Sequence, residues 1–236
     1  MRGDLQSRIE RLDWNGIASA LNEDGYFLTE PLPTAAECEE LVAMYPEDKL
    51  FRSRIVMARY RFGSGEYKYF AYPLPEIVEE VRARFYPKLV KIANEWSDKL
   101  GAGDSFPLEH EKFLKECHQS GQKRPTPLLL RYEAGDYNCL HQDLYGRIAF
   151  PLQLTCFLSK KSVYTGGEFV LTEQQPRAQS KVQVLAPEQG QVLIFTTRFR
   201  PKKGTRGYYR VNIRHGVSRL HSGMRYTLGV PFHDAE

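Results

Sequence analysis

The sequence predicts an α+β protein with a mainly β core, a jelly roll carrying N-terminal supporting helices. Two observations predict it. Apolar residues recur at three- and four-residue steps before residue 125 and at two-residue steps after it, which is the change from helical to strand periodicity. The later segments are short and are separated by glycine-rich turns, and such spacing is typical of a sandwich or small barrel. A jelly roll hides most strand edges.

The N-terminal half carries three helical patterns. Residues 4–22 and residues 75–99 each place apolar side chains on one stripe, which predicts two helices. Between them, Thr34 followed three residues later by Glu37 forms a capping-box pattern that predicts a further helix start. The segment 26–28 is expected to be a short strand. The stripe of 75–99 consists of Ile77, Val78, Val81, Phe85, Leu89, Ile92 and Trp96.

The C-terminal half has the texture of a β core. We therefore divide the chain into an N-terminal helical and substrate-recognition region, 1–124, packed on a core, 125–236, as one structural unit. Turn residues such as Gly135, Gly190 and Gly223 separate the expected strands. These strands are 127–133, 150–158, 167–172, 181–186, 191–197, 208–215 and 225–232.

Composition bounds the class of protein. The chain has 236 residues, 42% of them apolar, and a formal net charge of +4, so it can bury a core and is only mildly basic. Its four cysteines form no C-x-x-C pair, which argues against a zinc ribbon or a thioredoxin-like motif. The N-terminus has no apolar h-region and no run reaches 18 apolar residues. We expect a cytoplasmic protein without a membrane span.

The most informative residues are His141, Asp143 and His215. Two imidazoles and one carboxylate are the ligand set of non-haem iron(II) oxygenases, although the same ligands also accept other divalent ions. Alternate residues of a strand share a face, so His141 and Asp143 point the same way if 141–145 is extended. The other histidines have no acidic partner at strand spacing and are expected to be surface or packing residues: His110, His118, His221 and His233.

The last two expected strands carry the other residues of the candidate site. In 208–215, His215 ends an apolar row that is expected to face inward, with charged residues on the opposite face. Arg225 and Thr227 share one face of the final strand. If His215 and Arg225 lie on adjacent antiparallel strands, both side chains can enter the same cavity.

Residues 127–232 carry six motifs in order: Arg131-Tyr132-x-x-Gly135, His141-x-Asp143, Gly166-Gly167-Glu168-Phe169, Gly190-x-x-Leu193-x-Phe195, His215-x-Val217 and Gly223-x-Arg225-Tyr226. In this order and spacing, they resemble the double-stranded β-helix core of the iron(II)- and 2-oxoglutarate-dependent dioxygenases, in their prolyl-hydroxylase-like branch. The segment Asp24-Gly25-Tyr26, with the helix that follows it, resembles the usual N-terminal approach to that core. Overall the chain is more similar to a bacterial subgroup assigned to oxidative demethylation of damaged nucleic acid.

The resemblance implies a role for each matched residue. His141, Asp143 and His215 would bind Fe(II) and form the catalytic centre, with 2-oxoglutarate as co-substrate and dioxygen as oxidant. Arg225 would pair with the distal carboxylate of 2-oxoglutarate, for which a bidentate guanidinium is well suited. Tyr132 would donate its hydroxyl to the same carboxylate or, equally well, serve as a core aromatic. Thr227 is a weaker candidate for the same contact.

Two segments are candidates for substrate recognition. Segment 52–72 interleaves cations with aromatic side chains, among them Arg59, Tyr60, Tyr67 and Tyr69, a composition that suits base stacking and phosphate contact. Segment 198–214 holds seven cations and no acidic residue. Ordinary strands and solvated loops can have the same compositions. The expected reaction is oxidative demethylation of alkylated nucleic acid. The alternatives are a prolyl or small-molecule hydroxylase and a non-catalytic, cupin-like binding protein.

Overall fold

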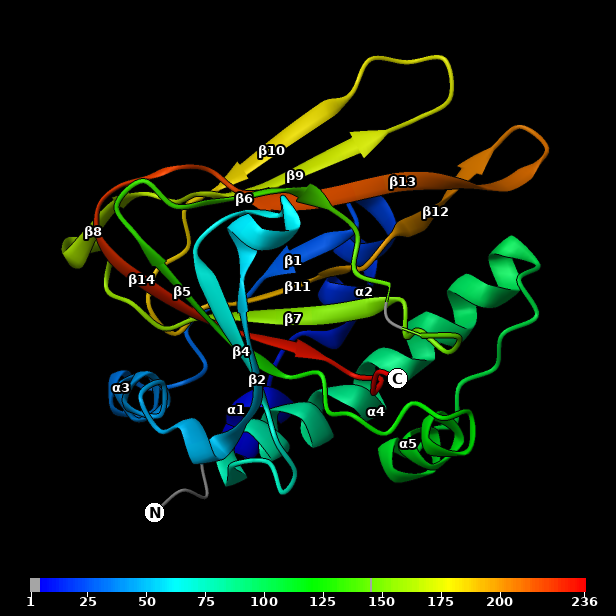
Figure 1. The fold of residues 1–236 in the computed structure, drawn as a ribbon. Helices are drawn as coiled ribbons and strands as arrows, with labels where there is room; N and C mark the ends of the chain where they lie inside the picture. The colour runs from blue at the N-terminus through cyan, green and yellow to red at the C-terminus, as the bar shows by residue number, and fades with distance from the viewer. Residues whose placement is uncertain (1–4, 145) are drawn as a thin grey trace.

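Two antiparallel sheets face each other in a computed structural model that describes residues 5–144 and 146–236 (Figure 1). Helices cover the outer face of the larger sheet, and two long hairpins extend the smaller sheet beyond the core (Figure 1). The expected α+β jelly roll is therefore confirmed. It follows from the period-two pattern of the C-terminal half, whose buried side chains meet between the sheets.

The larger sheet has eight strands among the described residues. Two of its strands, β2 (Phe51–Val56) and β4 (Glu66–Phe70), come from the N-terminal half. This half therefore supplies strands of the sheet as well as the helices. The strands, in spatial order, are β1 (Tyr26–Leu28), β11 (Val192–Thr196), β7 (Leu152–Phe157), β14 (Leu220–Pro231), β5 (Leu128–Glu133), β4 (Glu66–Phe70) and β2 (Phe51–Val56), with β8 (Tyr164–Gly166) paired to β14.

The smaller sheet has six strands in the described part of the chain. Three of them were not expected: β3 (Gly63–Ser64), β6 (Tyr137–His141) and β12 (Phe199–Gly204). β6 has no clean alternation of buried and exposed residues, and β12 contains Pro201, which is tolerated because β12 pairs only with β13 at an edge. The order is β10 (Lys181–Leu185), β9 (Phe169–Gln174), β13 (Gly207–Val217), β6 (Tyr137–His141) and β3 (Gly63–Ser64), with β12 (Phe199–Gly204) paired to β13.

The N-terminal helices are α1 (Leu5–Glu10), α2 (Trp14–Glu23), α3 (Ala35–Ala43), α4 (Glu76–Leu100) and α5 (His110–Gln119). The single helix expected over 4–22 is wrong, and residue 4 lies outside the described residues. Helix α1 ends at Glu10. A second helix begins after Asp13, whose side chain accepts a hydrogen bond from the Gly16 amide. The predicted capping box of Thr34 and Glu37 is confirmed. Helix α5 was not predicted.

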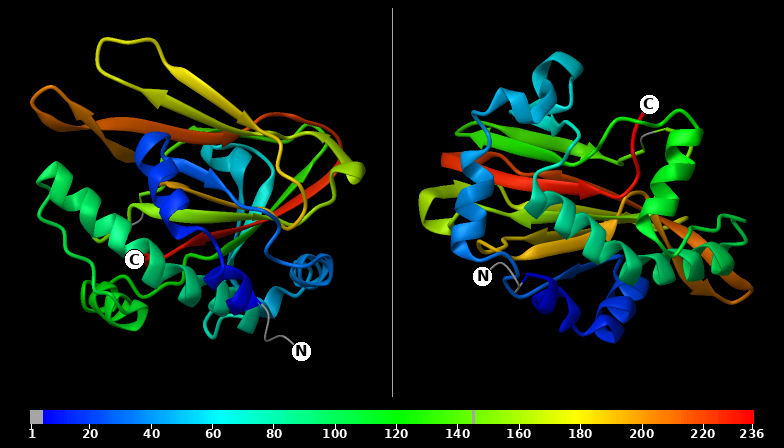
Figure 2. Two further views of the ribbon diagram at one scale, coloured as in Figure 1. Left: turned by 180° about the vertical axis from the view of Figure 1, so that it is seen from behind. Right: turned by 90° about the horizontal axis from the view of Figure 1, so that it is seen from below.

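One core lies between these helices and the larger sheet (Figure 2). Helix α4 contributes the whole expected stripe, from Ile77 to Trp96, and every member is buried. A smaller core between the two sheets contains Phe157, Phe169, Phe195 and Ile213. The two cores together hold the larger sheet rigidly from both faces, which is the support that a cavity between the sheets needs.

Candidate metal centre and co-substrate cavity

A cavity of about 340 Å³ opens between the two sheets. Strands β6 and β13 of the smaller sheet line one side, and β5, β7 and β14 of the larger sheet line the other. The lining includes seven of the candidate site residues singled out from the sequence: Tyr67, Tyr132, His141, Asp143, His215, Arg225 and Thr227. Residues far apart in the chain therefore meet in one space.

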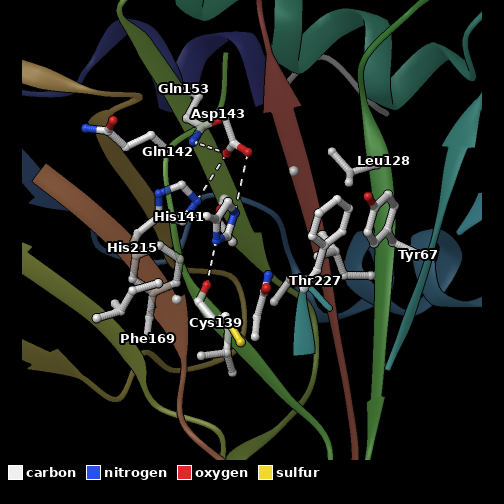
Figure 3. A pocket seen from close by; sticks show the side chains of 18 of the residues that line it. Tyr67, Leu128, Cys139, His141, Gln142, Asp143, Gln153, Phe169, His215 and Thr227 are labelled. Carbon is white, nitrogen blue, oxygen red and sulfur yellow. Dashed lines mark hydrogen bonds and ion pairs between the residues drawn. The ribbon is translucent and has the colours of Figure 1, made fainter. Parts of the chain in front are cut away.

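The two histidines and the aspartate meet at one end of this cavity (Figure 3). His141 and His215 are directly opposite each other in the β6–β13 ladder. Asp143 lies between them, with Oδ1 3.4 Å from His141 Nε2 and Oδ2 3.1 Å from His215 Nε2. Atoms up to about 4 Å apart can share one ion, because metal–nitrogen and metal–oxygen bonds are about 2 Å long. The three side chains therefore fit a single metal ion.

Asp143 reaches this position without a strand of its own. The extended segment expected over 141–145 is wrong in part: β6 ends at His141, residues 142–144 are irregular, and residue 145 lies outside the described residues. The loop is fixed instead by side-chain bonds. Gln142 Nε2 donates to the carbonyl oxygens of Arg198 and Ile213, at 2.7 and 2.9 Å. These contacts attach the loop to β13 and to the segment before β12.

Further hydrogen bonds orient the ligand atoms. His141 Nδ1 lies 2.8 Å from the Cys139 carbonyl oxygen. Because a carbonyl only accepts, Nδ1 carries the proton and Nε2 is free to bind a metal. Gln153 Nε2 donates to Asp143 Oδ2 at 2.7 Å (Figure 3). Gln153 was missed, although a polar residue inside the apolar strand 150–158 is a signal that could have found it.

The electrostatics favour a carboxylate between imidazoles. Burial alone would raise the pKa of Asp143, but the charges and hydrogen bonds of His215 and His141 hold it well below its ordinary value. Burial lowers the pKa of His215. For His141, burial is the largest single influence and lowers the pKa, but the hydrogen bond and charge of Asp143 and the backbone hydrogen bonds together raise it. An anionic oxygen thus lies beside two nitrogen donors, which is the chemistry of a divalent transition-metal site.

Arg225 lies in the same cavity without an ion-pair partner among the described residues. Its side chain is 1% exposed, and its three guanidinium nitrogens have no hydrogen-bond acceptor in the described part of the chain. The rings of Tyr132 and Phe157 lie 5.6 and 5.3 Å from the guanidinium carbon. Burial lowers its pKa, yet arginine stays protonated in proteins. A buried, unpaired cation is costly, so this site fits an anionic ligand.

The strands that bear His215 and Arg225 are not adjacent, which was the arrangement considered from the sequence. β13 pairs with β6, β9 and β12, whereas β14 pairs with β5, β7 and β8. The two residues lie on different sheets and reach one cavity because both face the space between them. Arg225 is directly opposite Tyr132 in the β14–β5 ladder, and the Tyr132 hydroxyl accepts a hydrogen bond from Asn138. Thr227 is buried on the same face as Arg225.

The residues considered for substrate binding lie in different settings. Tyr67 lines the cavity. Arg59 and Tyr60 lie on an exposed 3-10 turn, η2 (Met57–Tyr60), next to it. Tyr69 is buried against Tyr67 and beneath Arg52 and is not part of the cavity lining.

The two basic segments are only partly available for binding. In 52–72, Arg54 pairs with Glu66, and Lys68 pairs with Asp48. In 198–214, Arg200 is buried against Glu173, with a 2.8 Å ion pair. Lys202 is half-buried and donates a hydrogen bond to Gln175. The other five cations of the second segment are exposed: Arg198, Lys203, Arg206, Arg210 and Arg214.

Fold and site together define a jelly-roll enzyme of the mononuclear oxygenase class. Residues 65–235 match a family of oxygenases described as catalysing oxidative methylation of damaged DNA. The match covers more than half of the chain, and the chain belongs to this family. The expected enzyme class, an iron(II)- and 2-oxoglutarate-dependent oxygenase, is confirmed, and the non-catalytic, cupin-like alternative is set aside.

Relatives and solved structures agree with this assignment. An uncharacterized protein of Mycobacterium tuberculosis, in strains H37Rv and CDC 1551, is 46% identical over 167 residues, which is 70% of this chain and 72% of the relative. A Pseudomonas putida prolyl-4-hydroxylase structure is 11% identical with a TM-score of 0.52 and covers 92% of this chain and 96% of that one. A Burkholderia pseudomallei oxidoreductase of the 2OG-Fe(II) oxygenase family is 15% identical with a TM-score of 0.53, covering 95% and 93%.

A Trichoplax adhaerens prolyl hydroxylase is likewise 15% identical with a TM-score of 0.56, covering 98% of this chain and 92% of the other. At these identities the solved structures show a shared fold. The helices of the described residues lack the length and apolar character needed to cross a membrane.

Proposed function

We propose that this oxygenase removes alkyl groups from damaged DNA bases by oxidation, with His141, Asp143 and His215 holding iron(II) and Arg225 holding 2-oxoglutarate. The observation that carries the proposal is the buried Arg225 guanidinium, which has no acceptor in the described chain and lies in the same cavity as three metal-ligating side chains. A dicarboxylate would supply the missing acceptor at one end and reach the metal with the other.

Each ligand residue has a defined task in this proposal. His141 and His215 supply neutral nitrogens, and Asp143 supplies an anionic oxygen whose direction is fixed by the Gln153 amide. When bound, the iron with 2-oxoglutarate and dioxygen supplies the oxidation that inserts one oxygen atom into a substrate C–H bond. Arg225 binds the distal carboxylate, with Thr227 and Tyr132 beside it as hydroxyl donors.

The reaction balances as a demethylation. An N-methyl base, dioxygen and 2-oxoglutarate give the hydroxymethyl base, succinate and carbon dioxide. The hydroxymethyl group then leaves as formaldehyde, and its hydroxyl proton passes to the base nitrogen. The apolar walls formed by Leu128, Leu130 and Phe169 exclude water from the oxidation. Family membership supports damaged DNA as the substrate.

Two surfaces support a polyanionic partner. The β12–β13 hairpin presents the exposed cations Arg206, Arg210 and Arg214. The η2 turn presents Arg59, and the capping residue after it is the exposed Arg61. Such cations bind phosphates, with an affinity that falls steeply with salt. The likeness to prolyl hydroxylases, at 11% and 15% identity, concerns the fold and leaves prolyl hydroxylation as a distant alternative.

The test is product release from anaerobically iron-loaded protein. Succinate and formaldehyde are measured with methylated oligonucleotides, proline peptides and free amino acids as substrates. Formaldehyde released in step with succinate, and only from methylated oligonucleotides, supports the proposal. Succinate release stimulated only by a proline peptide overturns it. His141→Ala should abolish turnover while the circular-dichroism spectrum stays unchanged, because one metal ligand is lost from an otherwise intact fold.

A further inference from the structure

Two aromatic side chains are stacked on the surface beside the cavity. Tyr60 and Phe62 are 54% and 48% exposed, and their ring centroids lie 5.5 Å apart with an angle of 20° between the ring planes. Exposed parallel rings give up the apolar contacts that burial would provide. Such a pair, rimmed by polar residues, marks a surface that binds something flat or apolar.

The backbone fixes this pair to the metal-bearing strand. The Phe62 carbonyl accepts a hydrogen bond from the Cys139 amide at 2.8 Å, two residues before His141. Gly63 is opposite Asn138 in the β3–β6 ladder, and a Cβ at Gly63 would lie 2.3 Å from the Tyr137 carbonyl oxygen. Only glycine allows this approach. The stacked pair is therefore held at a set position relative to the metal site.

Apolar and cationic side chains adjoin the pair. Phe62 and Arg61 line the cavity, as do the exposed Leu140 and Leu144. Arg59 and Arg61 are exposed and have no ion-pair partner among the described residues, in contrast to Arg54, which is bound to Glu66. Flat rings beside free guanidinium groups are the combination that binds single-stranded nucleic acid through base stacking and phosphate contact.

The size of the cavity explains why stacking is needed. Its volume of about 340 Å³ is shared with the metal site and the Arg225 site, and it lies at the lower end of pockets for small ligands. It admits one base and excludes a paired duplex. An enzyme that acts on a base must take it out of the stack, which costs a few kcal/mol. The bases on either side of the extruded base then lose a stacking partner, and another flat group must replace it.

We propose that Tyr60 and Phe62 stack on the nucleotides flanking the damaged base and hold that base extruded into the cavity. This inference rests on the proposed function and deepens it. It assigns the substrate class as a single-stranded or locally unstacked strand, with Arg59 and Arg61 contacting its phosphates. Of the two rings, Phe62 is the one that lines the cavity, so its stacking should matter most for holding the extruded base.

The test compares ring-deleted variants with the parent protein on one oligonucleotide. A single strand carries an N-methylated base with 2-aminopurine as its neighbour. Affinity is measured by fluorescence anisotropy, and stacking is measured by 2-aminopurine fluorescence. The variants Tyr60→Ala, Phe62→Ala and Phe62→Leu are compared with Leu108→Ala, which removes an exposed apolar side chain outside the cavity.

We expect Phe62→Ala and Phe62→Leu to weaken binding by roughly tenfold to a hundredfold, because stacking contributes about 1–3 kcal/mol per base. They should also remove the 2-aminopurine quenching that the parent protein causes. Phe62→Trp should restore both signals, and Leu108→Ala should match the parent.

Parent-like affinity and quenching in Phe62→Leu would overturn the inference, since an apolar side chain without a flat ring would then suffice, as for a protein partner. Parent-like behaviour of the Tyr60→Ala and Phe62→Ala double variant would overturn it too. If these variants behave as the parent while the parent still releases formaldehyde, only the stacking role fails. If the parent releases no formaldehyde from any methylated oligonucleotide, the proposed function itself fails.

Discussion

His215 and Arg225 lie on strands of different sheets, β13 and β14, and both side chains enter the cavity between those sheets. One is a nitrogen donor beside Asp143, and the other is a buried cation without a hydrogen-bond acceptor in the described chain. A ligand that touches both must therefore span the sandwich.

Arg225→Lys should weaken binding of 2-oxoglutarate by roughly tenfold to a hundredfold, because an ammonium group cannot make the paired hydrogen bonds of a guanidinium. The dissociation constant is measured by titration of the iron-loaded protein under anaerobic conditions. Arg84→Lys, at an exposed position of α4, is the matched control. An unchanged constant in Arg225→Lys would remove Arg225 from the co-substrate site.

Gln153→Leu should lower metal affinity by roughly tenfold to a hundredfold. The Gln153 amide donates a 2.7 Å hydrogen bond to Asp143 Oδ2, and without it the carboxylate loses its fixed direction. Metal affinity is measured by competition with a chelator, which does not depend on turnover. Gln183→Leu, on β10 outside the cavity lining, is the matched control. Equal affinities of the two variants would show that the amide does not position Asp143.

Two buried histidines should make the fold sensitive to acid. Burial lowers the pKa of His110 and of His233 to about 4, against 6.5 in the unfolded chain. The His110 ring donates to the Phe232 carbonyl, while His233 Nδ1 accepts from the Phe150 amide. Both rings are therefore neutral in the folded state.

The unfolded state then binds more protons between pH 6.5 and about 4, so stability is complete above that window and falls as the pH drops through it. At pH 5 the loss should be about 4 kcal/mol for the two sites together. Urea unfolding at pH 7.5 and pH 5 measures it. His110→Gln keeps a hydrogen-bond donor but cannot titrate in this range, so it should reduce the difference by about half. Equal stability at both pH values would contradict the assignment.

Arg200 and Arg206 belong to one basic segment but should respond differently to substitution. Arg200 is buried in an ion pair with Glu173, so Arg200→Gln should destabilise the fold by about 3 kcal/mol or more, because a buried carboxylate loses its partner. Arg206 is exposed at the tip of the β12–β13 hairpin. Arg206→Gln should leave the unfolding free energy unchanged.

On the proposed nucleic-acid surface, Arg206→Gln should lower the salt slope of oligonucleotide binding by about one unit. Affinity is measured at several salt concentrations for the parent protein, for Arg206→Gln and for Arg84→Gln as a control at an exposed position of α4. If all three proteins show the same salt slope, the β12–β13 hairpin does not contact the phosphate backbone.

The sequence by itself determined the fold class, the long helix α4 and the strand β13. In β13 the alternation places Val211, Ile213 and His215 inside and Arg214 outside, as the structure confirms. These features were readable because each depends on a local period, and burial of one face enforces that period. The motif around His141 and Asp143 was readable from residue type and spacing, but Asp143 reaches the site from the irregular segment 142–144 and not from a strand.

Only the tertiary structure decided how the strands are shared between sheets. The alternation of residues within one strand does not indicate which strands it pairs with. The sequence of either strand therefore could not show that His215 and Arg225 lie on opposite sheets and face one cavity. The support of Asp143 by Gln153, the burial of Arg200 and the exposure of Tyr60 and Phe62 depend on contacts between distant segments. Residue type set what each side chain can do, and the packing of the two sheets set which of them do it together.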